Sequence, residues 1–113
     1  MREILNPTVS HNIDLAAMQG SAVRACSLMK VLANPDRLLL LCQLSQGEKA
    51  VGELENILGI YQPTLSQQLT VLRDEGLVNT RREGKKIYYS IASAKAVAIM
   101  QVLYQQFCQK DHS

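Results

Sequence analysis

The sequence predicts a mainly α-helical fold with one small β-hairpin, in the order α-α-α-α-β-β-α. Apolar residues recur every three or four positions through most of the chain, and the period changes to two only between residues 77 and 91. Glycine, proline and asparagine stand at the boundaries of these segments, where chain reversals are expected. With 113 residues, the chain has room for one domain around one core.

The N-terminal part is predicted to be a flexible arm followed by a long helix. Residues 1–12 show no helical or strand period, so we expect a flexible arm there and a single domain over 13–113. From Asp14 onward an apolar stripe runs at helical spacing. Its members are Leu15, Met18, Ala22, Ala25, Met29 and Leu32.

Two shorter helices follow. Asn34 and Pro35 are typical of an N-cap and a first helical position, and Gly47 is placed to end this second helix. A third helix is predicted over Val51–Leu58 and is ended by Gly59. Its residues expected to face the core are Leu54, Ile57 and Leu58.

A fourth helix is predicted from Gln62 to Glu75. Its apolar stripe consists of Leu65, Leu69 and Leu72. Gly76 followed by Leu77 indicates a Schellman ending, in which glycine adopts the left-handed conformation and the next apolar residue packs back.

The last part reads as a hairpin and a helix. Strands are predicted over Leu77–Arg82 and Lys86–Ile91, with Gly84 in the connection, and a final helix over Ser93–Cys108. A helix pair directly before a projecting hairpin is the arrangement of a winged helix-turn-helix. An apolar helix therefore stands at each end of the domain.

Composition excludes several classes of protein. The net charge is +2, and 47% of residues are hydrophobic, as in ordinary globular proteins. No signal-peptide pattern opens the chain and no apolar run could cross a bilayer, so we expect a cytoplasmic protein without membrane contact. No Ser/His/Asp set or phosphate-binding glycine loop is present, so an enzyme is not expected, and no cofactor is predicted.

The fourth helix and the hairpin carry a candidate DNA-binding surface. The helix presents amide and hydroxyl side chains, which suit base edges in a major groove: Gln62, Thr64, Ser66, Gln67, Gln68 and Thr70. The hairpin presents four cations that could contact phosphates: Arg81, Arg82, Lys85 and Lys86. Each feature alone also fits an ordinary solvated surface, and a winged helix can instead bind another protein. Their succession favours double-stranded operator DNA.

Three segments resemble the ArsR/SmtB family of bacterial winged-helix repressors. They are Leu32–Leu38 (LANPDRL), Gln62–Val78 with its QPTLSQQL start, and Arg81–Ile91 (RREGKKIYYSI). The sequence departs from the family at Tyr61, where Ser is usual, and at Gln68, where His is common. The resemblance implies a homodimer, formed through the first and last helices, that leaves its operator when an inducer binds.

Many members of this family sense metals, and this alternative can be tested on the residues. Ala50 and Gly52 stand where one family site has thiolates, and the last helix begins Ser93-Ala94-Lys95 without an acid or histidine. Soft metals need such ligands, so no metal site is predicted. A metal-sensing repressor remains the nearest alternative.

The three cysteines form no CxxC motif, and buried packing is their ordinary interpretation. Cys42 and Cys108, however, resemble the dithiol of the biofilm- and sulfide-responsive, BigR-like subgroup of the family. That resemblance implies a redox switch in which reactive sulfur species or an oxidant joins the two thiols and acts as inducer. Cys26 is expected to be a packing residue.

Overall fold

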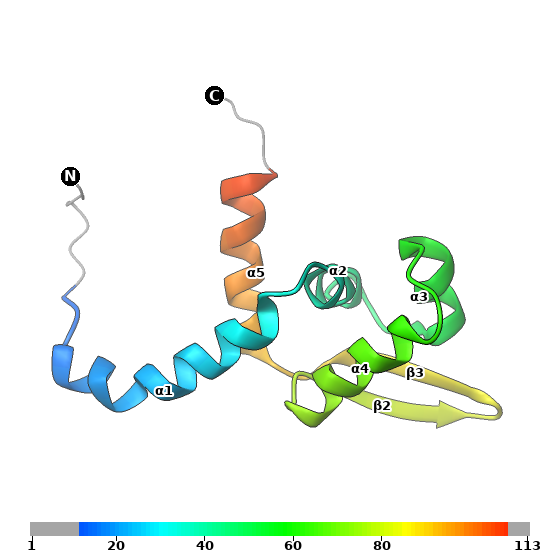
Figure 1. Cartoon of the computed structure of the whole chain (residues 1–113), viewed down its shortest axis with the longest axis horizontal. Helices are drawn as coiled ribbons and strands as arrows, with labels where there is room; N and C mark the ends of the chain where they lie inside the picture. Colours follow the sequence, from blue (N-terminus) through cyan, green and yellow to red (C-terminus); the bar gives the residue numbers. More distant parts are fainter. Residues whose placement is uncertain (1–11, 109–113) are drawn as a thin grey trace.

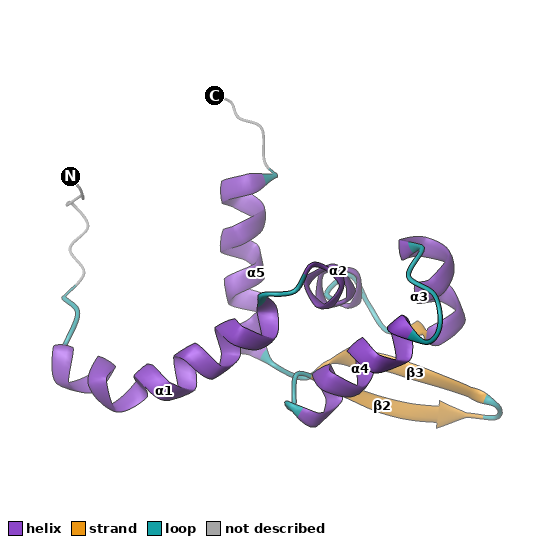
Figure 2. Ribbon diagram, in the orientation of Figure 1, coloured by secondary structure: helices purple, strands orange, loops and turns teal. Residues whose placement is uncertain are grey.

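The computed structural model describes residues 12–108, and the expected flexible arm over 1–12 lies almost wholly outside that range. Five helices and three strands follow each other as α1, α2, β1, α3, α4, β2, β3 and α5 (Figures 1 and 2). The helices are α1 Leu15–Leu32, α2 Pro35–Leu44, α3 Val51–Leu58, α4 Thr64–Asp74 and α5 Ala94–Phe107. The strands are β1 Lys49–Ala50, β2 Val78–Glu83 and β3 Lys86–Ile91. The winged helix-turn-helix is thereby confirmed.

Strand β1 is an element that the sequence pattern did not predict. It pairs antiparallel with β3, through Lys49 opposite Tyr89 and Ala50 opposite Tyr88, so that the sheet order is β1-β3-β2. Two residues are too short to show a period of two. The wing is therefore a hairpin whose inner strand is also attached to the start of α3.

The helix ends follow capping chemistry that is visible in the sequence. The side chain of Asn34 accepts a hydrogen bond from the Arg37 backbone N–H at 3.0 Å, and Asp14 and Ser93 cap α1 and α5 in the same way. At the end of α4, the Leu77 N–H donates to the Leu72 carbonyl at 2.9 Å and Gly76 has φ +77°. This is the predicted Schellman ending, and it directs the chain from α4 into the wing.

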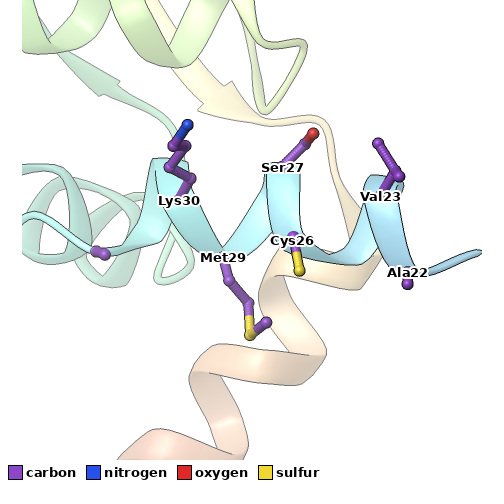
Figure 3. Close-up of a pocket in the computed structure, with 7 residues that line it drawn as sticks. Ala22, Val23, Cys26, Ser27, Met29 and Lys30 are labelled. Atoms are coloured by element: carbon purple, nitrogen blue, oxygen red, sulfur yellow. The ribbon is translucent and has the colours of Figure 1, made fainter.

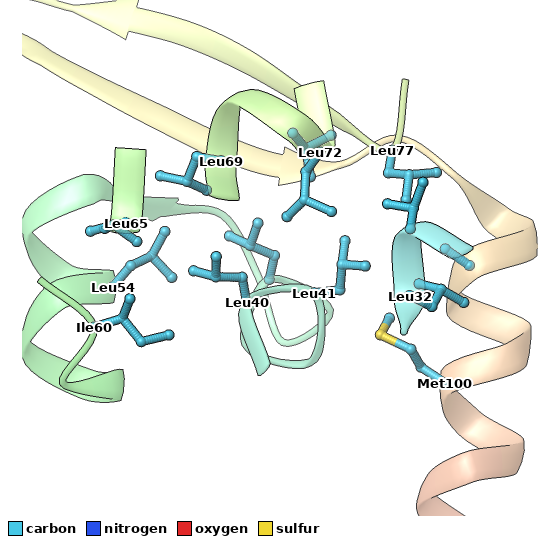
Figure 4. Close-up of a cluster of buried hydrophobic side chains, with 14 residues drawn as sticks. Leu32, Leu40, Leu41, Leu54, Ile60, Leu65, Leu69, Leu72, Leu77 and Met100 are labelled. Carbon is cyan, nitrogen blue, oxygen red and sulfur yellow. The ribbon is translucent and has the colours of Figure 1, made fainter. Parts of the chain in front are cut away.

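The core lies between α2, α3, α4 and the base of the sheet. Six leucines have at most 1% of their surface exposed: Leu40, Leu41, Leu54, Leu65, Leu69 and Leu72 (Figure 4). The α4 stripe is thus buried as expected. Ile57 was wrongly expected to face inward: it is 51% exposed, because Leu54 already occupies the inner side of this short helix.

Helix α1 extends away from the rest of the molecule, and α5 rises beside its C-terminal end (Figure 1). The radius of gyration is 16.8 Å, whereas a compact chain of this length would have about 13 Å. Only Val31 and Leu32 of α1 are buried. None of the helices within residues 12–108 has the length and apolar character needed to cross a membrane.

Candidate nucleic-acid interface and thiol pair

The burial of one side of α4 determines what its other side presents. Because Leu65 and Leu69 anchor the helix in the core, Ser66, Gln67 and Thr70 are exposed on the outer side. Thr64 and Gln68 are half-buried at the edges of this face. The structure therefore separates the six predicted residues of this region into fully and partly accessible ones.

Gln62 precedes α4 and closes its first turn. Its Oε1 accepts hydrogen bonds from the Ser66 backbone N–H at 3.0 Å and from the Ser66 hydroxyl at 2.6 Å. It satisfies a backbone donor at the helix start, which the Tyr61 side chain cannot do, whereas the Tyr61 carbonyl accepts from the Leu65 N–H at 3.0 Å. Gln62 as a whole is exposed at the start of the helix.

Gln68 has a partner that the sequence did not indicate. The Arg37 guanidinium, near the start of α2, donates from Nη1 to the Gln68 Oε1 at 2.9 Å. The same group donates from Nε to the Val31 carbonyl at 2.7 Å. Arg37 belongs to the LANPDRL segment, but no local pattern could reveal a contact with a residue 31 positions away.

The four cations of the wing are all exposed, but they are not equivalent. Arg81 donates from Nε and Nη2 to both carboxylate oxygens of Glu48, at 2.8 and 2.9 Å, and from Nη1 to Glu83 at 3.3 Å. Its Cζ also lies 4.6 Å from the centroid of the Tyr88 ring, opposite it on β3. Arg81 thus joins the wing to the segment before β1.

Charge pairing between Arg81 and Glu48 shifts the pKa of both side chains. The hydrogen bonds from Arg81 lower the pKa of the Glu48 carboxyl, and the same bonds raise the pKa of Arg81. No ion pair is found for Arg82, Lys85 or Lys86 among the described residues. These three side chains are therefore the cations of the wing that are most available to phosphates.

Cys42 lies in a groove between α2 and α5. Its Sγ is 3.9 Å from the Sδ of Met100, and Tyr104 also lines the groove. Cys108 follows Tyr104 by one helical turn, and its N–H donates to the Tyr104 carbonyl at 2.8 Å. Met100 and Tyr104 therefore lie one turn apart on one side of α5, and Cys108 follows directly after its last residue.

The two thiols are free and close enough to influence each other. Partial burial raises the pKa of the Cys42 thiol, and the neighbouring Cys108 raises it further. Both cysteines retain exposed surface, contrary to the ordinary expectation of buried packing. Both thiols of the predicted pair are therefore free and accessible in this chain.

Cys26 was wrongly expected to be a packing residue. It is exposed and lines a shallow apolar pocket on α1 together with Ala22, Val23 and Met29. Figure 3 shows Cys26 and Met29 projecting to one side of the helix, away from Ser27 and Lys30. The regular stripe of α1 faces out of this chain because the core is already closed by α2 and α4.

Both terminal helices expose large apolar side chains. On α1, Leu15 is 67% and Met29 54% exposed; on α5, Val102 is 54% and Phe107 82% exposed. Of the α5 stripe, Ala96 and Met100 are buried and Leu103 is half-buried. The predicted interface helices thus carry apolar surface that this single chain does not cover.

Comparison with known proteins agrees with this architecture. Residues 34–80 match the model of "Bacterial regulatory protein, arsR family". A biofilm growth-associated repressor of Agrobacterium fabrum is 52% identical over 101 residues, which cover 89% of this chain and 86% of that protein. The crystal structure of the transcriptional repressor BigR from Xylella fastidiosa superposes with a TM-score of 0.83 at 47% identity, covering 87% of this chain and all of that one.

A further solved structure is similar at lower identity. The homodimeric winged helix-turn-helix DNA-binding domain Mb0332 from Mycobacterium bovis has a TM-score of 0.65 and is 32% identical. The match covers 94% of this chain and 98% of that domain. The likeness therefore extends over the terminal helices as well as the helix-turn-helix.

Proposed function

The chain belongs to the arsR family of bacterial regulatory proteins, and from that premise we propose a homodimeric repressor whose operator affinity is controlled by two thiols. It is a DNA-binding transcriptional repressor of the biofilm growth-associated type, not an enzyme. The proposal concerns how it holds DNA and how it is released.

The operator-binding surface consists of α4 and the wing. Helix α4 enters a major groove and presents Ser66, Gln67 and Thr70 to base edges, with Gln62 and Thr64 at its start. Arg82, Lys85 and Lys86 meet phosphates beside it. Two such surfaces in a twofold dimer require an inverted repeat, whose half-sites lie about one DNA turn, ~34–36 Å, or a multiple of it apart.

The switch is a covalent link between Cys42 and Cys108. The observation that supports it is the groove in which Cys42 faces Met100 and Tyr104 of α5, since Cys108 follows Tyr104 by one helical turn. With a persulfide as oxidant, the two thiols form one disulfide while the persulfide sulfurs leave as one thiol and one hydrogen sulfide. Two electrons pass from the cysteines to the persulfide, and the protons are retained in the two products.

The link can affect DNA because its two helices have different tasks. Leu40 and Leu41 of α2 lie under α4, whereas α5 carries part of the proposed dimer interface. Fixing Cys42 to Cys108 constrains α5 against α2 and thereby the spacing of two recognition helices. Only a strain that differs between free and DNA-bound forms lowers affinity, and a coupling of about 1–3 kcal/mol is typical.

The test is DNA binding by purified protein, reduced and persulfide-treated, on a duplex that the protein selects from a random-sequence library. We expect Cys42→Ser and Cys108→Ser each to bind as wild type when reduced and to lose the response to persulfide. Cys26→Ser is the matched control and keeps the response. A response that survives both substitutions, or that depends on Cys26 alone, contradicts the switch.

Zinc added to reduced protein tests the metal-sensing alternative in the same assay. Within residues 12–108, no three His, Cys, Asp or Glu side chains are grouped so that they could hold a metal ion. We therefore expect operator affinity to be unchanged by zinc. Release of the duplex at stoichiometric zinc would favour metal sensing over the thiol switch.

A further inference from the structure

The Arg37 side chain connects the C-terminal end of α1 with the recognition helix α4. From its place in the first turn of α2, it donates to the Val31 carbonyl at 2.7 Å and to the Lys30 carbonyl at 3.5 Å. Its remaining terminal nitrogen, Nη1, donates to the Gln68 Oε1 at 2.9 Å. One half-buried side chain of α2 therefore contacts two other helices, α1 and α4.

The end of α1 provides a suitable site for this cation. The last carbonyls of a helix have no partners within the helix, and the C-terminus carries partial negative charge from the helix dipole. Arginine satisfies both needs because its planar guanidinium presents several donors at fixed angles. The position of Arg37 is thus set by α1 and by its own backbone, which Asn34 caps at 3.0 Å.

Gln68 is oriented by this fixed group. A guanidinium has donors only, so it selects the amide oxygen of Gln68. Gln68 is also half-buried, whereas its neighbour Gln67 is exposed and has no side-chain hydrogen bond within the described part of the chain. The two adjacent glutamines of α4 therefore have different surroundings.

We propose that Arg37 and Gln68 are positioning residues that fix the recognition helix relative to the end of α1, and that Gln68 does not read bases. This inference rests on the proposed function, because it matters only if α4 enters DNA. It changes the sequence-based expectation for Gln68. If the dimer forms through α1, the Arg37–Gln68 contact fixes the angle between each recognition helix and the axis of the dimer, because it holds α4 against the end of α1.

The consequence is a loss of specificity instead of a general loss of DNA binding. Specific binding needs both α4 helices at the correct angle and spacing, whereas binding to any duplex depends mainly on phosphate contacts. Arg37→Met and Gln68→Met should therefore lower affinity for the selected duplex about fivefold or more, a typical coupling. Affinity for a scrambled duplex of equal composition should hardly change.

A double-mutant cycle tests whether the two side chains act as one unit. The Arg37→Met/Gln68→Met protein should bind the selected duplex no worse than the weaker single variant, because the shared contact is lost only once. Arg24→Met, which removes a cation from α1 without touching these carbonyls, is the control for charge. Circular dichroism on each variant shows whether it is folded.

Substitution by glutamate separates positioning from base reading. Gln68→Glu keeps an oxygen for Arg37 but removes the amide donor, so we expect it to retain the ratio of selected to scrambled affinity. Gln67→Glu adds the same charge on the exposed face and should reduce that ratio. A fall in the ratio of selected to scrambled affinity in Gln68→Glu would overturn the inference. So would a double variant whose loss of binding free energy equals the sum of the two single losses. If wild-type protein selects no duplex at all, the proposed function fails instead.

Discussion

At the scale of single residues, the groove around Cys42 combines accessibility with an unfavourable setting for a thiolate. Burial against α5 removes part of its hydration, and Cys108 adds like charge when both thiols ionise. Cys42 is therefore mostly protonated near neutral pH. Because the thiolate is the reacting form, the raised pKa slows the reaction of Cys42 with a persulfide as it does with any other oxidant.

The pH dependence of Cys42 alkylation should reveal this setting. Its pKa is raised, so its reaction with iodoacetamide should have a midpoint above that of a cysteine in an unfolded peptide. Cys108→Ser should lower the midpoint in part, because burial, the larger cause, remains. Peptide mass spectrometry over a pH series measures the rate at Cys42 alone.

The linked effect on stability has a definite sign. Because the folded-state pKa of Cys42 lies above the unfolded one, its contribution to stability is full below the ordinary thiol pKa. It is lost as pH rises through the raised value. A midpoint at or below that of the free peptide would show that the groove does not hold the thiol as described.

At the scale of elements, the helices could be predicted and several of their connections could not. Spacing alone predicts the buried stripe of α4, which consists of Leu65, Leu69 and Leu72. The pair Gly76-Leu77 predicts how α4 ends. Strand β1 has only two residues and therefore no period. The contacts of Arg37 with Gln68 and of Arg81 with Glu48 join residues 31 and 33 positions apart. Such pairs leave no local pattern.

The thiol pair and the apolar stripe of α1 were also predictable only in part from the sequence. The resemblance of the sequence to a subgroup of repressors indicated Cys42 and Cys108, and the link between them stays a prediction, although the structure places Cys42 in a groove against α5. Periodicity identified the α1 stripe containing Met29, but it could not decide whether that stripe faces its own core or another surface. The answer depends on α2 and α4, which complete the core without this stripe. Cys26 is exposed for the same reason.

The wing should show two kinds of cation. Lys85→Ala and Arg82→Ala should each weaken binding to selected and scrambled duplexes alike and reduce the slope of log affinity against log salt by about 1. Arg81→Ala should change the slope less, because two of its nitrogens already bind Glu48. Fluorescence anisotropy over a salt series measures the slopes. Equal slope changes for Arg81→Ala and Lys85→Ala would assign Arg81 to the phosphates instead.

At the scale of the whole molecule, α1 and α5 carry exposed apolar faces, and we propose that a second copy of the chain covers them. A single chain leaves Met29 and Phe107 in water, and α1 stands away from the core. A second copy is the occupant that fits best, because the homodimeric relative is similar over both terminal helices. In the proposed twofold dimer, both copies bury their own Met29 and Phe107, so one substitution changes the interface at two places.

Placing a charge on this surface should therefore have a large effect. Met29→Asp forfeits about 2 kcal/mol of apolar burial in each copy, and at about 1.4 kcal/mol per tenfold the dimer should dissociate about a thousandfold more readily. Ile57→Asp is the matched control, since Ile57 is equally exposed but lies on α3, outside the terminal helices. Sedimentation velocity should show wild type and Ile57→Asp as dimers and Met29→Asp as a monomer with unchanged helix content. A wild-type monomer, or a Met29→Asp dimer as stable as wild type, would place the interface elsewhere and remove the geometric basis for an inverted-repeat operator.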